Sequence, residues 1–390
     1  MAEAARAGAA PLHRGLPDEI AIWEILVRLP PKSLLRCRAV CRAWRLATSS
    51  RGFLLAHHGR QPALPLIYEY KDGVRPSLDI MPLEHREGVA AADQLYSIAR
   101  LVTYMDHEAC CDGLLILSTT RSCYSYSFRF SVCNPATRQY APLPLVSGFT
   151  PLGMYPDPPT GEYRLLLYPD AHDELAPVAE DACYVSALGS CLPPRHIGWP
   201  QAGAAIHGSV PVLFHGSLHW HIEKDEGATN MIMVFDTTAE LFRQMRAPAV
   251  PGAADLFEMD GMLGIAGFND AVTTIDIWMM QDYDSEVWAL RYRVDLPVAD
   301  LTEQFGVVKS SALLVSSWGD DVLILVQFGE WLVQIGIDGK LVASFYRKLL
   351  GPTQLRLKQS LVPHTFFPAL EGYLVNTWPF ISQENNVVNT

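Results

Sequence analysis

The chain has 390 residues, of which 49% are hydrophobic and 18% charged, so it is long enough for two or three globular domains and too apolar to be disordered throughout. Its net charge of −12 is unevenly spread, because residues 1–60 carry ten Lys/Arg and four Asp/Glu, whereas the remainder carries twenty and thirty-eight. A body this acidic is a poor candidate for nucleic-acid binding, since phosphate contacts need lysine and arginine. No run of 18 apolar residues is present, so we expect no membrane partner.

The chain ends and the cysteines give expectations about the cellular compartment. Residues 1–14 contain no apolar stretch of the kind found in secretory signals, so we expect a disordered leader there and a flexible tail at 381–390. The eight cysteines form no C-x-x-C pair and the sequence has no Asn-x-Ser/Thr acceptor, which fits free thiols in a reducing compartment. We therefore expect a cytoplasmic and/or nuclear location.

Residues 16–46 are predicted to form two or three short helices. Pro17 suits the first turn of a helix, and the acidic pair after it complements the helix N-terminus. Apolar residues then recur at i, i+3, i+4 and i+7, which predicts one apolar helix face, and Pro30-Pro31 should end that helix. A second helical run is expected to carry four side chains on one side: Leu34, Cys37, Cys41 and Trp44.

A unit this small rarely buries enough apolar surface to be stable alone. We therefore expect its large apolar residues to complete their burial against another protein, by docking helices into a groove. A helical hairpin packed on its own domain is the alternative interpretation.

In this region the chain resembles the F-box family. The matching stretches are LP at 16–17, EIL at 24–26, RLP at 28–30, KSLLR at 32–36 and VCRAWR at 40–45. The resemblance implies an F-box over residues 15–58 that docks onto a Skp-type adaptor and through it onto a cullin. We predict that twelve residues form the docking surface: Leu16, Pro17, Ile22, Ile25, Leu26, Leu29, Pro30, Leu34, Leu35, Val40, Cys41 and Trp44.

After residue 60, short runs of β-branched and aromatic residues alternate with Pro and Gly, which predicts an all-β region. We expect a linker at 59–63, a β domain over 64–380 with its first strand at 66–70, and consider a short helix near 90–96.

A repeat of turns divides this β domain. A glycine turn precedes an apolar strand at intervals of 48, 55, 45 and 58 residues: at Gly113, Gly161, Gly216, Gly261 and Gly319. In four of these units an Asn or Asp turn follows 19 to 21 residues later: at Asn134, Asp236, Asp282 and Asp338. Such repeats are typical of propeller blades, which pack radially because a single small sheet cannot bury its faces. We predict a β-propeller-like domain of about six blades, with seven as the next choice; two stacked sheets are the competing architecture.

The β domain also resembles the F-box-associated domain of plant F-box proteins, a propeller-like module. The resemblance rests on VCNPATR at 132–138 with Leu143-Pro144, on HGSLHW at 215–220 and on VFDTTAELFRQM at 234–245. That family usually has Trp before the Asn-Pro pair, where this chain has Cys133. The order of the two resemblances implies an adaptor-binding head followed by a ligand-binding module.

Few residues in the β domain favour catalysis. His215, His219 and His221, with His207 upstream, are the one cluster that could bind zinc, but no carboxylate or cysteine accompanies them at ligand spacing. The acidic run 282–286 lacks the glycine and distal glutamate of an EF-hand loop and falls at a predicted hairpin turn. The tryptophans are expected mostly between blades. We therefore expect no metal and no cofactor.

The predicted function is that of a non-catalytic substrate-recognition subunit of a Skp–cullin–F-box ubiquitin ligase. The F-box would bind the Skp adaptor, and the propeller would bind a target protein that the sequence does not identify. The alternative is a propeller-based glycan-binding protein or metal-dependent enzyme with a helical cap.

Overall fold

The structure is a computed structural model that describes most of the chain: residues 16–71, 77–82, 97–102, 105–122, 125–157, 160–170, 182–198, 210–222, 230–250, 254–269, 271–305, 310–318, 321–346, 350–377 and 379–380. It divides into two compact units, residues 1–61 and 62–390. Over these described ranges, no helix has the length and apolarity needed to cross a membrane. The predicted leader, tail and short helix near 90–96 lie outside the described residues.

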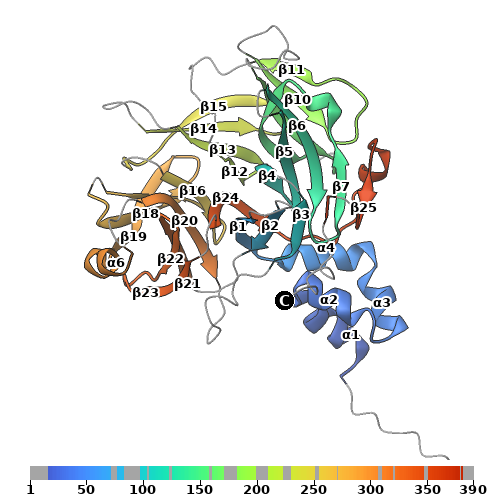
Figure 1. The fold of residues 1–390 in the computed structure, drawn as a ribbon, viewed down its shortest axis with the longest axis horizontal. Coiled ribbons are helices and arrows are strands. Elements are labelled where there is room, and N and C mark those ends of the chain that lie inside the picture. Colours follow the sequence, from blue (N-terminus) through green and yellow to red (C-terminus); the bar gives the residue numbers. More distant parts are fainter. Residues whose placement is uncertain are drawn as a thin grey trace, which may run out of the picture. The chain divides into compact units, whose positions relative to one another are not determined.

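The first unit is helical (Figure 1). Its first helical run changes hydrogen bonding from α1 (Asp18–Ile20) through the π-helix η1 (Ala21–Ile25) to the 3-10 helix η2 (Leu26–Arg28). Leu29 then has an extended backbone, as the two following prolines predict. Three further helices complete the unit: α2 (Pro31–Cys37), α3 (Arg42–Thr48) and α4 (Arg51–Arg60).

The second predicted helical run is divided in two. Cys41 lies outside both α2 and α3 with an extended backbone (φ −153°), and its Sγ accepts a hydrogen bond from the Trp44 backbone N–H at 3.4 Å. Cys41 is therefore the N-cap of α3, and it does not share a helix face with Leu34. The periodicity alone missed this break because a cysteine is an uncommon N-cap.

The predicted linker at 59–63 overlaps two regular elements. Helix α4 continues to Arg60, and strand β1 (Ala63–Lys71) begins two residues later. Pro65 is tolerated in β1 because the pairing with the neighbouring strand shifts register between Pro65 and Ile67.

The second unit contains six antiparallel sheets, which are the blades of a propeller (Figure 1). The first blade has the strand order β24-β1-β2-β3, the second β4-β5-β6-β7-β25 and the third β8-β9-β10-β11. The strands of these blades that follow β1 are β2 (Ser77–Pro82), β3 (Ala99–Val102), β4 (Asp106–Cys111), β5 (Leu114–Ser122), β6 (Ser125–Asn134), β7 (Gln139–Pro142), β8 (Phe149–Pro156), β9 (Tyr163–Pro169), β10 (Cys183–Ala187), β11 (Arg195–Gly198), β24 (Leu350–Lys358) and β25 (Leu374–Val375).

The other three blades use consecutive strands, β12–β15, β16–β19 and β20–β23. Between the fifth and sixth blades lies helix α6 (Val298–Phe305), and two 3-10 turns, η3 (Pro144–Val146) and η4 (Phe367–Ala369), lie elsewhere in the unit. The strands of the fourth, fifth and sixth blades are β12 (Val212–Phe214), β13 (Ser217–Ile222), β14 (Met231–Asp236), β15 (Leu241–Arg246), β16 (Ala254–Met259), β17 (Met262–Phe268), β18 (Thr274–Asp282), β19 (Val287–Asp295), β20 (Ser310–Trp318), β21 (Asp321–Phe328), β22 (Trp331–Ile335) and β23 (Leu341–Tyr346).

The turn repeat of the sequence corresponds to the blades. Gly113, Gly161, Gly216 and Gly261 have φ between 68° and 83° and lie in the turns that join the first and second strands of their blades, whereas Gly319 lies outside the described residues. Four Asn or Asp side chains occupy the turns between the third and fourth strands, where each accepts backbone N–H groups within its own turn: Asn134, Asp236, Asp282 and Asp338. The prediction of about six blades is confirmed.

Strand β24 closes the ring. It pairs antiparallel with β1, so the first blade combines the beginning and the end of the propeller sequence (Figure 1). Further around the ring, Trp220 is fully buried between blades and donates from Nε1 to the Leu152 carbonyl at 3.2 Å. Trp220 thus occupies the position between blades that was predicted for the tryptophans.

Candidate functional site

The helical unit exposes about half of the twelve predicted docking residues. The exposed residues are Leu16, Pro17, Ile25, Leu35, Val40 and Cys41, and the half-buried residues are Leu29, Pro30 and Trp44. Ile22, Leu26 and Leu34 are instead buried within the unit, with 9%, 2% and 0% of their surface exposed. These three residues support the fold of the unit, and a partner would meet the exposed ones.

The π-helix explains part of this division. In a regular α-helix, Ile22, Ile25 and Leu26 would share a face. The wider turn of η1 rotates the residues that follow, so that Ile22 and Leu26 are buried while Ile25 remains 45% exposed. A local change of hydrogen bonding of this kind leaves no trace in a hydrophobic pattern.

Sequence reasoning missed four exposed apolar side chains in the same unit: Ile20, Trp23, Leu46 and Leu55. A usable signal existed, because Leu16, Ile20 and Trp23 follow the i, i+4, i+7 spacing of helix-in-groove anchors. Trp23 is 43% exposed, and its ring centroid lies 5.5 Å from that of the buried Phe53.

Hydrogen bonds hold this exposed face on a fixed scaffold. The Leu29 carbonyl is left without an intrahelical partner where the first helical run ends, and it accepts from His57 Nε2 at 2.8 Å and from Gln61 Nε2 at 3.2 Å. Burial lowers the pKa of His57, so the ring is a neutral donor at physiological pH. Arg38 donates to the Thr48 carbonyl at 2.7 Å and thereby joins the ends of α2 and α3.

Charge accompanies the exposed apolar side chains. Seven basic side chains in the described part of this unit are exposed: Arg28, Lys32, Arg36, Arg42, Arg45, Arg51 and Arg60. Such a surface favours an acidic protein partner, because opposite charges accelerate encounter.

His219, the middle residue of the predicted histidine cluster, is bonded within the fold of the propeller. His219 is fully buried in β13, where Nδ1 donates to the Ser217 carbonyl at 3.0 Å and Nε2 lies 2.9 Å from the Tyr283 hydroxyl. Burial lowers its pKa to about 4. In the part of the chain that the structure describes, no three His, Cys, Asp or Glu side chains form a metal-binding group. His207 lies outside that part.

The acidic run 282–286 is a hairpin turn between β18 and β19, as predicted. Asp282 Oδ1 accepts from the backbone N–H groups of Asp284 and Ser285 at 3.0 and 3.1 Å. The same bonds lower the pKa of Asp282.

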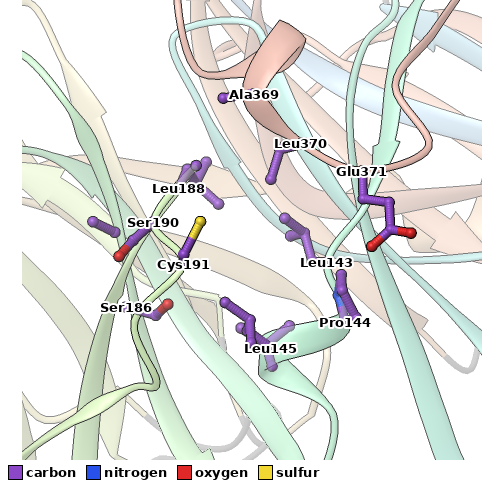
Figure 2. A pocket seen from close by; sticks show the side chains of 13 residues that line it. Leu143, Pro144, Leu145, Ser186, Leu188, Ser190, Cys191, Ala369, Leu370 and Glu371 are labelled. Carbon is purple, nitrogen blue, oxygen red and sulfur yellow. The ribbon is translucent and has the colours of Figure 1, made fainter.

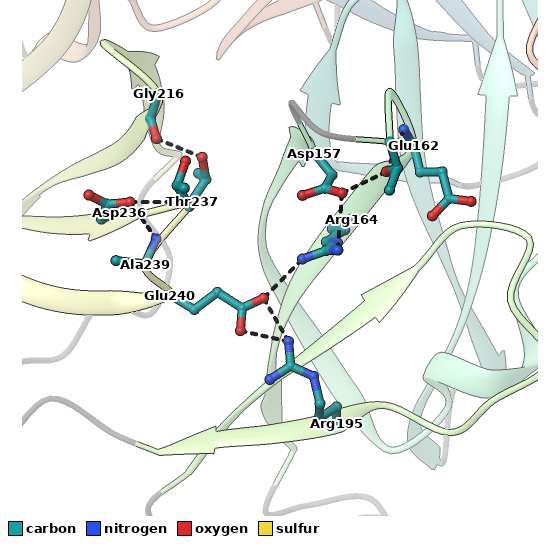
Figure 3. A network of polar contacts seen from close by, with 11 residues as sticks. Asp157, Glu162, Arg164, Arg195, Gly216, Asp236, Thr237, Ala239 and Glu240 are labelled. Carbon is teal, nitrogen blue, oxygen red and sulfur yellow. Dashed lines mark hydrogen bonds and ion pairs between the residues drawn. The ribbon is translucent and has the colours of Figure 1, made fainter.

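A network of ion pairs joins the third and fourth blades (Figure 3). Glu240, in the turn between β14 and β15, binds Arg164 at 3.1 Å and Arg195 at 2.6 Å. Arg164 also binds the buried Asp157 at 3.1 Å. The carboxylates of Glu240 and Asp157 are both engaged by a guanidinium, so these ion pairs serve as a contact between blades.

The fold and the helical unit together define a class, proteins with an F-box followed by a propeller. The sequence profile described as F-box-like matches residues 14–58, and that of the F-box associated beta propeller domain matches residues 82–326. The chain belongs to the F-box associated propeller family.

Proteins named as F-box proteins in Arabidopsis thaliana are similar to this chain. The F-box protein At5g49610 is 24% identical over 299 residues, covering 70% of this chain and 77% of the relative. The F-box protein At1g30790 is 23% identical over 334 residues, covering 75% and 78%. A nidogen/laminin complex contains a chain with a looser likeness, with 12% identity, 75% and 95% coverage and a TM-score of 0.40.

Proposed function

We propose that this protein is a substrate receptor of a Skp–cullin–F-box ubiquitin ligase. The helical unit binds a Skp-type adaptor, and through it a cullin, while the propeller binds the target protein. The observation that carries the proposal is the set of large exposed apolar side chains on the small helical unit: Leu16, Ile20, Trp23, Ile25, Leu35, Val40, Leu46 and Leu55. A free unit with this much apolar surface is expected to have a partner.

The chain itself supplies no catalytic group in this proposal. Ubiquitin transfer is accelerated by proximity, because the assembly holds a lysine of the target near the charged conjugating enzyme and raises its effective concentration. We also propose a cytoplasmic and/or nuclear location; all seven cysteines in the described ranges are free, which fits a reducing compartment.

The test is adaptor binding by the full chain with its exposed residues changed. Leu35→Glu and Val40→Glu together should lower the affinity for purified Skp adaptor at least about tenfold, because both side chains are exposed and a charge opposes their desolvation. Leu241→Glu, at an exposed leucine of the propeller, is the matched control. Titration calorimetry measures the affinity, and circular dichroism checks the fold.

Leu26→Glu is not a suitable variant, because a charge at a side chain that is 2% exposed should unfold the helical unit. Unchanged affinity in the folded double variant, or equal loss in the Leu241→Glu control, would count against adaptor docking through these residues.

A further inference from the structure

The propeller has a pocket at its side to which the proposed function assigns no role. Its volume is about 240 Å³. It lies between the second and third blades, where three chain segments meet: residues 143–146, which include η3, residues 186–191, which include the end of β10, and residues 369–371 near the C-terminal end of the propeller. We call it the side pocket. The propeller family profile matches residues 82–326, so the wall formed by residues 369–371 lies outside the matched range.

The lining of the side pocket is mostly apolar, with Ser186 and Ser190 as its hydroxyl-bearing residues. Leu143, Leu188 and Leu370 point toward the same space from the three segments, with Leu145 below them and the Cys191 thiol beside Leu188 (Figure 2). Leu145 is 42% exposed at the side pocket, and Leu192, the residue after the lining residue Cys191, is 72% exposed. These two exposed leucines extend the apolar lining to the surface, as is expected of an interaction site.

The walls of the side pocket are held in place before any partner arrives. Asn134 Nδ2 donates to the Ser360 carbonyl at 3.1 Å, and Gln139 Nε2 donates to the Tyr373 hydroxyl at 2.8 Å. On the third blade, a Cβ on Gly189 would lie 2.7 Å from the Phe366 Cβ, so the C-terminal segment is closely packed there. A preformed pocket binds with little loss of conformational entropy.

The size and charge of the side pocket select one kind of occupant. Pockets for whole drug-sized ligands measure about 300–1,000 Å³, whereas this one is smaller and has room for one large apolar side chain of a bound segment. Glu371 lies at one side of the opening, is exposed, and is the one charged residue in the lining (Figure 2). Its carboxylate would attract a cation on a partner, in keeping with the acidic propeller.

We propose that the side pocket binds a short peptide segment of the target protein, inserting a leucine- or phenylalanine-like side chain and placing a lysine or arginine beside Glu371. This rests on the proposed function, in which the propeller holds the target. A buried apolar anchor next to a peripheral ion pair is the usual arrangement of an interface hot spot.

The experiment screens the full chain against a positional library of short fluorescent peptides by fluorescence polarisation. Peptides that combine a large aliphatic or aromatic residue with a neighbouring basic residue should bind best. Leu145→Glu should lower the affinity for these peptides at least about tenfold, because it places a charge at the apolar wall of the side pocket. Glu371→Lys should shift the preference from a basic to an acidic neighbour.

Two variants away from the side pocket serve as matched controls, Leu241→Glu and Glu303→Lys, both at exposed positions. They should leave peptide binding unchanged. The proposal is overturned by a screen without such peptides, by binding that Leu145→Glu leaves intact, or by a different occupant. Native mass spectrometry that detects a co-purified apolar molecule would identify a small ligand as the occupant. Self-association that is lost in Leu145→Glu would identify a second copy of the chain as the occupant. Adaptor binding is measured in the same samples, so failure of the pocket is distinguishable from failure of the receptor function.

Discussion

His219 shows how a single residue that could be mistaken for a metal ligand contributes to stability. Its ring has no exposed surface and binds two backbone carbonyls, Val212 and Ser217, as well as the Tyr283 hydroxyl. Tyr283 in turn accepts from Arg243 at 2.9 Å, and the charge of Arg243 further disfavours a protonated His219. A neutral ring is therefore part of the native packing.

This arrangement predicts a loss of stability in mild acid. The pKa of His219 is about 4 in the folded protein and about 6.5 in the unfolded chain, so the unfolded chain binds the proton first and the free energy of unfolding falls as pH decreases between these values. Between pH 7 and pH 5, the titration of His219 should lower the free energy of unfolding by about 2 kcal/mol. Urea denaturation at the two pH values should show a smaller pH-dependent loss in His219→Gln than in the unchanged protein.

The control is His196→Gln, which replaces an exposed ring of the same unit. A pH-dependent loss in His219→Gln as large as that of the unchanged protein would show that other groups cause the acid sensitivity.

Elements of this propeller repeat one turn design in different surroundings. Asn134 and Asp282 occupy the same position of their blades, and each accepts two backbone N–H groups through one side-chain oxygen. Asn134 is fully buried and also donates to Ser360 in the C-terminal segment, whereas Asp282 is exposed. Both side chains thus stabilise their own turn, and Asn134 also binds the C-terminal segment of the chain.

Alanine substitution should separate these roles. Asn134→Ala should lower the free energy of unfolding by about 1–3 kcal/mol, because it leaves the buried Ser360 carbonyl without its donor. Asp282→Ala should cost clearly less, because its turn is exposed and water can replace the lost acceptor. Urea midpoints at constant m value give both costs. Equal losses in the two variants would mean that the bond to Ser360 adds nothing.

These elements also show which parts of the structure a sequence can predict. The turns at Gly216 and Asp236 were predictable because their conformations depend on adjacent residues, through positive φ and a side chain bonded within the turn. The exposure of Ile25 and the burial of Leu26 were not, since a π-helix decides them. The side pocket was also beyond prediction, because Leu143 and Leu370 meet only after the blades have packed.

At the scale of the whole molecule, closure of the ring depends on residues far apart in sequence. Arg356 in β24 donates to Asp255 in β16 at 2.7 Å and to the Val315 carbonyl in β20 at 2.6 Å, while the Val315 N–H donates to Asp255 at 2.8 Å. Three blades, the fifth, the sixth and the first, therefore meet at one ion pair. Asp255 is 1% exposed, and burial raises its pKa while the charge of Arg356 opposes that rise.

Removing one partner of this pair should weaken the ring more than removing both. Arg356→Met leaves a buried carboxylate without its counter-charge and should cost about 3–5 kcal/mol, whereas adding Asp255→Asn should restore part of that loss. In Arg356→Met the folded protein binds the Asp255 proton more tightly than the unfolded chain, so its stability deficit should shrink as pH falls from 7 toward 4. A double-mutant cycle by urea denaturation measures the coupling. Additive costs with no dependence on pH would show that the ring is closed by backbone pairing of β24 with β1 alone, and that this ion pair contributes nothing to it.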